Sequence, residues 1–167
     1  MSKNAEYIPG DLVMTNGVPL GTEEGVVYRV VSSDPSKTVT FSNGTVLKGA
    51  VTLENATDLS KGDKGYLFCD SPAWFKDLVP IPISRNVLEE NKWKRDGGIY
   101  IYNGMVAGSL PLLSATFVEM TDKGKMYSLI HIHLSDKLAV SCYFVHSFQH
   151  FLMGMGIDSD LEIKGNE

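Results

Sequence analysis

The chain has 167 residues, of which 43% are hydrophobic and 21% are charged. These proportions are typical of a folded globular protein and exclude an intrinsically disordered one. The formal net charge of −5 argues against tight, non-specific binding of nucleic acid, which needs clustered Lys and Arg side chains. No apolar stretch reaches the roughly 18 to 20 residues of a membrane span, and the first residues lack the apolar core of a signal peptide. We therefore expect an intracellular protein without a membrane partner.

The first 70 residues alternate short β-strand patterns with turn residues. The strand patterns cover residues 11–15, 25–33, 38–42, 45–53 and 64–68. Asn43-Gly44 is a strong hairpin signal, because both central residues of that turn need positive φ angles. Five short strands in so few residues predict a small, curled SH3-like β-barrel, since a flat open sheet of that size would leave its edges exposed.

Residues 71–83 contain Pro72, Pro80 and Pro82, which favour an extended connector over a strand or a helix. Ser84 is a candidate N-cap for a short helix over residues 85–93. We expect Val87, Leu88 and Trp93 to face inward from this helix, and Gly97-Gly98 to end it.

Residues 84–167 form the second half of the chain, and their pattern is mixed. Strand patterns cover residues 99–102, 114–120, 126–134 and 138–142. One apolar stripe at helical spacing then predicts a C-terminal amphipathic helix, and it consists of Phe144, Phe148, Phe151, Leu152 and Met155. The expected fold class is therefore α+β: a small barrel (1–70), a proline-rich connector (71–83) and an antiparallel sheet with two helices (84–167), packed as one body.

All four histidines lie between residues 131 and 150. His131 and His133 share one face of a strand, while His146, Gln149 and His150 share the helix face opposite the apolar stripe. Each histidine pair has a spacing compatible with zinc or another transition metal. If the apolar faces of strand and helix meet in the core, however, the two pairs point in opposite directions and cannot share one ion. We therefore expect polar surface or interface histidines and no metal cofactor, with a four-histidine metal site as the alternative.

Cys142 precedes the final helix and His146 follows one turn later, which is a spacing open to a thiol nucleophile and its base. Nothing nearby supplies an oxyanion hole or a third partner, so a buried and packed Cys142 is favoured. The glycine-rich turns and the scattered acidic residues match neither a phosphate-binding loop nor a glycosidase pair. We therefore expect a protein that is not an enzyme.

The aromatic pair Trp74 and Phe75 lies in the proline-flanked segment. Such a pair either fills the space between two subdomains, which we favour, or anchors a partner. Together with Trp93, the same rings could line a pocket between the two halves for a small signalling nucleotide.

Two stretches, "VPIPISRNVLEENKWKRDGGIYIY" and "YFVHSFQHFLMGMGIDSDLEI", resemble a group of small uncharacterised proteins of Bacteroides-type bacteria, their phages and mobile elements. That group has a "PIPLT" motif and a C-terminal helix of the type "YVHQLQNLYFAL". The matching positions are Gly10 to Val13, Val27 to Val30, Pro80 to Ser84, Leu88, Trp93, Val145, His146, Gln149, Phe151 and Asp160 to Glu162. His150 replaces an Asn of the group, and the His131/His133 pair has no counterpart in it.

The resemblance implies an accessory protein of a phage or mobile element, located in the cytoplasm of the host cell or associated with the virion. We expect it to act by binding another protein, in virion assembly or on a host factor. Formation of homo-oligomers is left open as a further possibility. The expected contact residues are Trp74, Phe75, Trp93, His146, Gln149 and His150. For His146 and Gln149 an equal alternative is that they hydrogen-bond backbone groups at the junction with the barrel and so satisfy buried polar groups. The alternatives are a counter-defence protein that sequesters a signalling nucleotide and a metal-dependent enzyme that uses His131, His133, His146 and His150.

Overall fold

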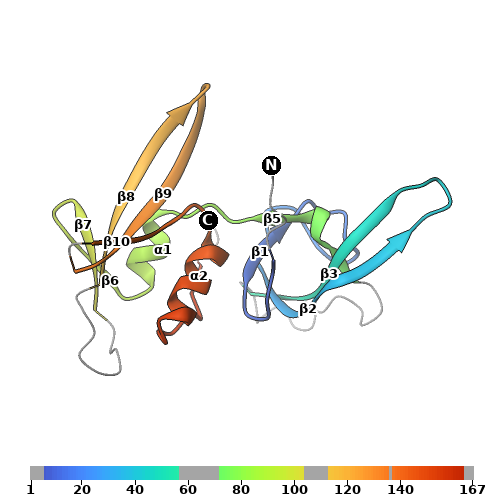
Figure 1. Ribbon diagram of the computed structural model, residues 1–167, viewed down its shortest axis with the longest axis horizontal. Coiled ribbons are helices and arrows are strands. Elements are labelled where there is room, and N and C mark those ends of the chain that lie inside the picture. Colours follow the sequence, from blue (N-terminus) through green and yellow to red (C-terminus); the bar gives the residue numbers. More distant parts are fainter. Residues whose placement is uncertain (1–5, 57–71, 104–112, 136, 164–167) are drawn as a thin grey trace. The chain divides into compact units, whose positions relative to one another are not determined.

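The computed structural model describes residues 6–56, 72–103, 113–135 and 137–163. The chain divides into two compact units, with the boundary between Pro80 and Ile81. In its described residues, each unit contains one five-stranded antiparallel sheet (Figure 1).

The sheet of the first unit has the strand order β4-β3-β2-β1-β5. Its strands are β1 (Leu12–Thr15), β2 (Tyr28–Thr40), β3 (Val46–Asn55), β4 (Ala73–Trp74) and β5 (Leu78–Pro80). A single 3-10 turn, η2 (Phe75–Asp77), joins β4 to β5. The core of the unit is made of Tyr7, Val13, Tyr28, Val30, Val51, Leu53, Ala73 and Leu78.

The expected SH3-like barrel is wrong, because the first sheet stays open in the described residues. β4 and β5 are its two end strands and pair with β3 and β1, not with each other. The strand expected at residues 64–68 lies outside the described residues.

The segment expected to be a connector, residues 71–83, instead supplies β4, η2 and β5 to the first sheet. Pro80 is accommodated because β5 is an edge strand, where a missing N–H leaves no ladder bond unmade. The two strands expected at residues 25–33 and 38–42 are one strand, β2, whose register shifts between Asp34 and Thr38. The Asp34-Pro35 turn is thus absorbed as a bulge.

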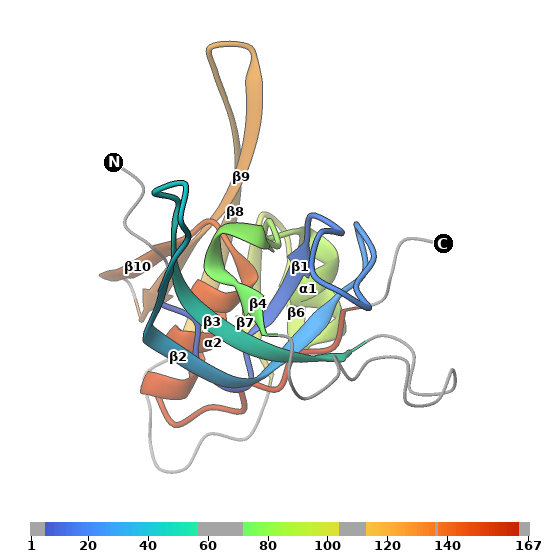
Figure 2. The ribbon, with the colours of Figure 1, turned by 90° about the vertical axis from the view of Figure 1, so that its right-hand side faces the viewer.

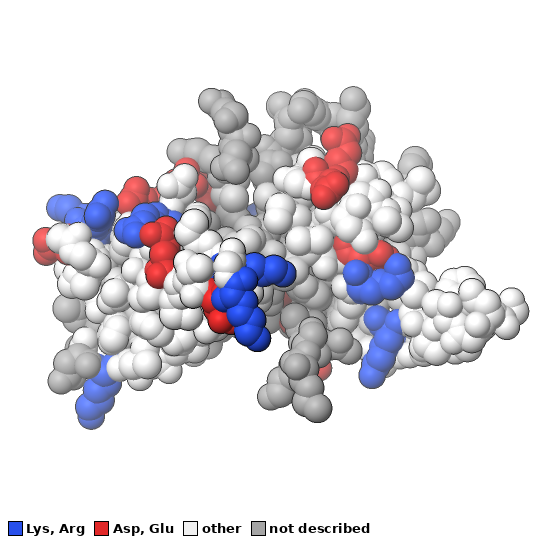
Figure 3. All heavy atoms as spheres, turned by 90° about the horizontal axis from the view of Figure 1, so that it is seen from above, with Lys and Arg blue, Asp and Glu red and all other residues white. Residues whose placement is uncertain are grey.

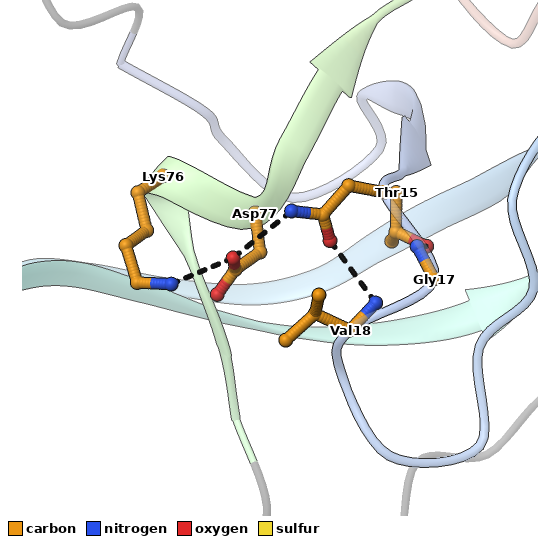
Figure 4. A network of polar contacts seen from close by, with 6 residues as sticks. Thr15, Gly17, Val18, Lys76 and Asp77 are labelled. Carbon is orange, nitrogen blue, oxygen red and sulfur yellow. Dashed lines mark hydrogen bonds and ion pairs between the residues drawn. The ribbon is translucent and has the colours of Figure 1, made fainter.

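A polar network fastens η2 to the loop that follows β1 (Figure 4). The buried carboxylate of Asp77 accepts a hydrogen bond from Asn16 Nδ2 at 3.1 Å and pairs with Lys76 Nζ at 2.7 Å. Asn16 Oδ1 in turn accepts the backbone N–H of Val18 at 3.1 Å. The buried charge of Asp77 is therefore both paired and hydrogen-bonded, as a charge at low exposure must be.

The sheet of the second unit is a meander with the strand order β10-β9-β8-β7-β6. Its strands are β6 (Trp93–Asp96), β7 (Ile99–Tyr102), β8 (Leu113–Asp122), β9 (Lys125–Leu134) and β10 (Lys137–Cys142). The hairpin of β8 and β9 extends well beyond the other strands (Figures 1 and 2). The described residues are thus mainly antiparallel sheet with two short helices, so the expected α+β class is also wrong.

Helix α1 (Arg85–Glu90) begins at the expected N-cap, because Ser84 Oγ accepts the backbone N–H of Val87 at 3.4 Å. It ends three residues earlier than expected, and Trp93 opens β6 instead. Gly97-Gly98 then makes the turn between β6 and β7, rather than ending a helix.

Helix α2 (Val145–Gly154) is held at its start by the chain segment before α1. Ile83 N donates to Tyr143 O and Val145 N donates to Ile81 O, both at 2.9 Å. Both helices lie on one side of the second sheet (Figure 1). On that side, Tyr100 Oη donates to Glu89 of α1 at 3.1 Å, and Trp93 contacts Phe148 of α2.

Candidate functional site

Phe75 is part of the packing of the first unit. Its ring packs against the core and meets the Tyr7 ring edge-on, with centroids 5.4 Å apart. Trp74 is half-buried on β4, opposite Ala50 of β3. Phe75 therefore stabilises its own unit, and both side chains are half-buried.

Trp93 is buried in the second unit, with only 3% of its surface exposed. Its ring contacts Tyr102 and Phe148, with centroids 5.4 Å and 5.7 Å away. The rings of Phe75 and Trp93, which were expected to line a nucleotide pocket, therefore each pack within their own unit.

His146 and Gln149 do not lie on a polar outer face of α2, so the expected surface position is wrong, and the alternative of a buried polar group bonded to backbone is the one observed for Gln149. They are 4% and 2% exposed, respectively, and join Val145, Phe148 and Leu152 on the buried face of the helix. Gln149 can be buried because its Nε2 donates to the backbone carbonyl of Ser159 at 3.0 Å.

The His146 ring lies between two other rings. It stacks on Phe144 with an interplanar angle of 8° and meets the His150 ring edge-on, with centroids 6.0 Å apart. Burial, followed by the nearby charge of His150, lowers the pKa of His146 to about 4. At neutral pH, His146 is therefore an uncharged, packed side chain.

His131 and His133 lie on β9, whereas His146 and His150 lie on α2. Both β9 histidines are half-buried. His131 Nδ1 and Ser141 Oγ are 2.7 Å apart across the β9–β10 ladder. Within the described part of the chain, no group of three or more His, Cys, Asp or Glu side chains is placed to hold a metal ion. The structure therefore does not bring the four histidines into one site.

Cys142 ends β10 and is 2% exposed. Its burial raises the pKa of the thiol to about 11, so the nucleophilic thiolate is scarce at neutral pH. The thiol is thus not prepared to attack a substrate.

A small cavity in the second unit lies between the end of α1 and residues 158–162. Its volume is about 150 Å³, below the range of roughly 300–1,000 Å³ for small-molecule sites. Lys92 Nζ spans its edge to Asp158 at 3.2 Å, and Asn91 hydrogen-bonds both backbone groups of Glu162 at 2.8 Å. We therefore assign the cavity to the packing of the C-terminal segment and not to a nucleotide.

The feature that sequence reasoning missed is the outer part of the β2–β3 hairpin, residues 34–50, which we term the arm. β1 pairs with β2 only at residues 28 and 29, and β4 pairs with β3 only at residues 50 and 51. Between Asp34 and Ala50 the hairpin is therefore a two-stranded ribbon among the described residues, and it continues past the rest of its sheet (Figure 1).

The arm exposes large apolar side chains. The exposed fractions are 37% for Val39, 49% for Phe41 and 56% for Val46. Val39 pairs with Leu47 on one side of the ribbon, and Thr40 pairs with Val46 on the other. Seen from above, the far end of the arm carries no blue or red side chain (Figure 3).

Local hydrogen bonds shape the arm at both ends. Asp34 Oδ1 accepts from Ser36 Oγ at 2.6 Å and from the backbone N–H groups of Ser36 and Lys37, and these bonds lower the pKa of Asp34. At the tip, Gly44 has a φ angle of +83° and donates to Phe41 O at 2.9 Å. The hairpin turns where the Asn43-Gly44 signal predicted, but the expected turn type is wrong: only Gly44 has a positive φ angle, and the Gly44 N–H bond to Phe41 O makes Ser42 and Asn43 the central residues.

Comparisons with models of known protein families, with curated proteins and with solved structures find no match for this chain. In the described residues, neither helix has the length and apolar composition needed to cross a membrane. The geometry of the chain itself is therefore the basis for a functional proposal.

Proposed function

We propose that this protein is a non-catalytic accessory protein that acts by binding another protein, with the arm as its binding element. The observation that carries the proposal is the exposure of Val39, Phe41 and Val46 on a ribbon to which no third strand is paired in the described part of the chain. A two-stranded hairpin is only marginally stable by itself, and the exposed parts of these three apolar side chains bury no area within the described chain. Their burial against a partner would add to binding.

The composition of the arm supports a protein partner. Among the 17 residues of the arm, only Asp34, Lys37 and Lys48 are charged. The outer part of the arm, from Thr38 to Leu47, contains no charged residue. Aromatic and apolar groups with few charges are typical of the centre of protein interfaces. Because apolar side chains lie on both sides of the ribbon, the expected partner has an apolar groove that holds it.

The order of the arm before binding also supports the proposal. The hydrogen bonds at Asp34 and the turn at Gly44 define its shape without a partner. Less conformational entropy is then lost on binding, which raises affinity for a given contact area. The resemblance to proteins of phages and mobile elements makes virion and host-cell proteins the first partners to test.

The test compares two variants that each remove two exposed apolar side chains. The arm variant carries Phe41→Ser and Val46→Thr, and the control carries Val18→Thr and Leu20→Ser in the loop after β1, where these residues are 68% and 64% exposed. Proteins retained by each chain in producing cells are compared by quantitative mass spectrometry. Binding of the purified partner is then measured by calorimetry.

We expect the wild-type chain and the loop control to bind the same protein with equal affinity, and the arm variant to bind it at least tenfold more weakly. Circular dichroism of both variants shows whether the sheets are intact. Equal binding by the arm variant, or the loss of binding in the loop control alone, would overturn the proposal.

A further inference from the structure

The side of the second sheet that faces away from α1 and α2 carries a second set of unusual side chains. We term it the open face. Arg85 of α1 lies over the Phe117 ring at 4.5 Å, and Glu89 of α1 bonds Tyr100, so Phe117 and Tyr100 define the helix-covered side. Successive residues of a strand point to opposite faces, so the neighbouring residues on each strand belong to the open face.

Two cross-strand rows run over the open face through the histidines of β9. One row consists of Ile99, Thr116, His131 and Ser141, and the other consists of Ile101, Ser114, His133 and Leu138. On β7 to β10 neither row contains an Asp, Glu, Lys or Arg, whereas on β6 the first row continues to Asp96 and the second to Lys94. The two imidazoles therefore lie side by side among uncharged neighbours, with one charge of each sign at the β6 edge of the face.

The spacing of His131 and His133 suits a shared metal ion. Their Cα atoms are two strand positions apart, about 6.6 Å at a rise of roughly 3.3 Å per residue. Both side chains project from the same face, so their rings can turn toward one ion. Imidazole nitrogen is a preferred ligand of zinc and related borderline metals.

Ser141 supplies the orientation that a metal-binding histidine needs. Its Oγ lies 2.7 Å from His131 Nδ1 on the adjacent strand. When Nδ1–H donates to this hydroxyl, the lone pair is on Nε2, the nitrogen free to bind a metal. Metal-binding histidines are usually held in this way through their second nitrogen.

One chain provides only half of a tetrahedral site. The described residues contain no third His, Cys, Asp or Glu grouped with this pair, and His146 and His150 belong to the helix-covered side. A second copy related by a two-fold axis would bring its own His131 and His133 to the same ion. The only charges of the two rows within the described strands, Asp96 and Lys94, lie at the β6 edge and have opposite signs, and Ile99 and Leu138, which are 41% and 57% exposed, would be covered.

We propose that His131 and His133 bind a divalent ion of the zinc class, and that two copies of the chain share this ion through their open faces. The metal supplies the link between the copies, and its site is incomplete in a single chain. This proposal concerns the second unit and does not depend on the arm of the first.

The test uses untagged protein, freed of metal with EDTA and titrated with zinc chloride. Sedimentation velocity measures the mass of the particle, and native mass spectrometry counts the bound ions. We expect a monomer without zinc and a dimer with one zinc per two chains when zinc is added. Cobalt(II) in place of zinc should show the visible absorption of tetrahedral coordination.

Three variants locate the site. We expect His131→Ala with His133→Ala to stay monomeric in zinc, and Ser141→Ala to bind zinc roughly 10- to 100-fold more weakly. His150→Gln removes a histidine from the helix-covered side and should dimerise like the wild type. Circular dichroism confirms that each variant is folded. Zinc-dependent dimers in the double variant, zinc bound one per chain to monomers, or no zinc binding by the wild type would each overturn the proposal.

Discussion

Gly49 lies directly beneath the ring of Phe75. The Gly49 φ angle is +70°, and a Cβ atom added there would lie 2.4 Å from Phe75 Cδ2. The glycine thus serves two purposes: it adopts a backbone conformation that other residues resist, and it leaves room for the ring that joins η2 to the core.

Gly49→Ala should therefore destabilise the first unit by about 2 to 4 kcal/mol, through backbone strain together with the clash. Urea unfolding followed by circular dichroism measures the loss. Gly44→Ala is the matched control, because Gly44 also has a positive φ angle but no atom within 4 Å of the added Cβ. We expect about 1 kcal/mol for the control. Equal losses in both variants would contradict the role of the Phe75 ring.

A double-mutant cycle separates the clash from the strain. Phe75→Ala alone should destabilise the unit, since the ring packs against the core and Tyr7. In the Phe75→Ala background, however, Gly49→Ala should cost only the strain of its φ angle. The sum of the two single losses should therefore exceed the loss of the double variant. Strict additivity of the unfolding free energies would mean that the two residues do not interact.

Protonation of His146 should make stability depend on pH. Burial and the His150 charge lower the pKa of His146 to about 4 in the folded protein, against 6.5 for an ordinary histidine. Between these values the unfolded chain binds a proton that the folded chain does not. The stabilisation is therefore complete above pH 6.5 and is lost as the pH falls toward 4, by at most about 3 to 4 kcal/mol.

The measurement is the free energy of unfolding at a series of pH values between 4 and 7.5. His146→Gln cannot take up the proton, so its stability should fall less steeply over this range, whatever its stability at neutral pH. A variant curve parallel to that of the wild type would show that His146 does not cause the dependence.

The buried thiol of Cys142 should react slowly. Its pKa is raised to about 11 and its side chain is 2% exposed, so both the thiolate and access to it are scarce. In a Cys69→Ser background, the rate of labelling by a thiol reagent at pH 8 reports Cys142 alone. We expect labelling to be at least a hundredfold slower in buffer than in 6 M guanidinium. Fast labelling in buffer would show that the end of β10 opens readily.

The Ser84 cap of α1 should contribute measurably to the free energy of unfolding, because the helix has only six residues. Ser84→Ala removes the acceptor for Val87 N and should lower stability by about 1 kcal/mol. Ser84→Asp keeps an acceptor at this position and should retain most of the stability that the cap contributes. Unfolding of the two variants by urea distinguishes these outcomes, and a stable Ser84→Ala chain would show that the cap bond is weak.

Local signals in the sequence predicted several elements at the right place. The Asn43-Gly44 turn, the Ser84 cap and the β8–β9 hairpin all depend on residues close together in the chain. The alternation along β9 also predicted that His131 and His133 lie on the face away from Ile130 and Ile132, which the strand pairing confirms.

The buried face of α2 could not be chosen from the helix alone. The phenylalanine stripe predicted Phe151 and Met155 as inward positions, whereas Gln149 and His146 are the more deeply buried. Gln149 is tolerated there because the Ser159 carbonyl, ten residues away, accepts its amide N–H. That bond exists only after the C-terminal segment has folded back on the helix.

By itself the sequence determined the hairpins, the Ser84 cap of α1 and the alternation of side chains along the strands. Each of these follows from steric and hydrogen-bonding preferences of near neighbours. Only the tertiary structure decided that the first sheet stays open among residues 6–56 and 72–80, with β4 and β5 as its separate ends. It also decided that no third strand of the described chain pairs with the arm and that Ser141 lies beside His131. These features depend on which distant segments pair, and pairing is set by long-range packing that no local pattern records.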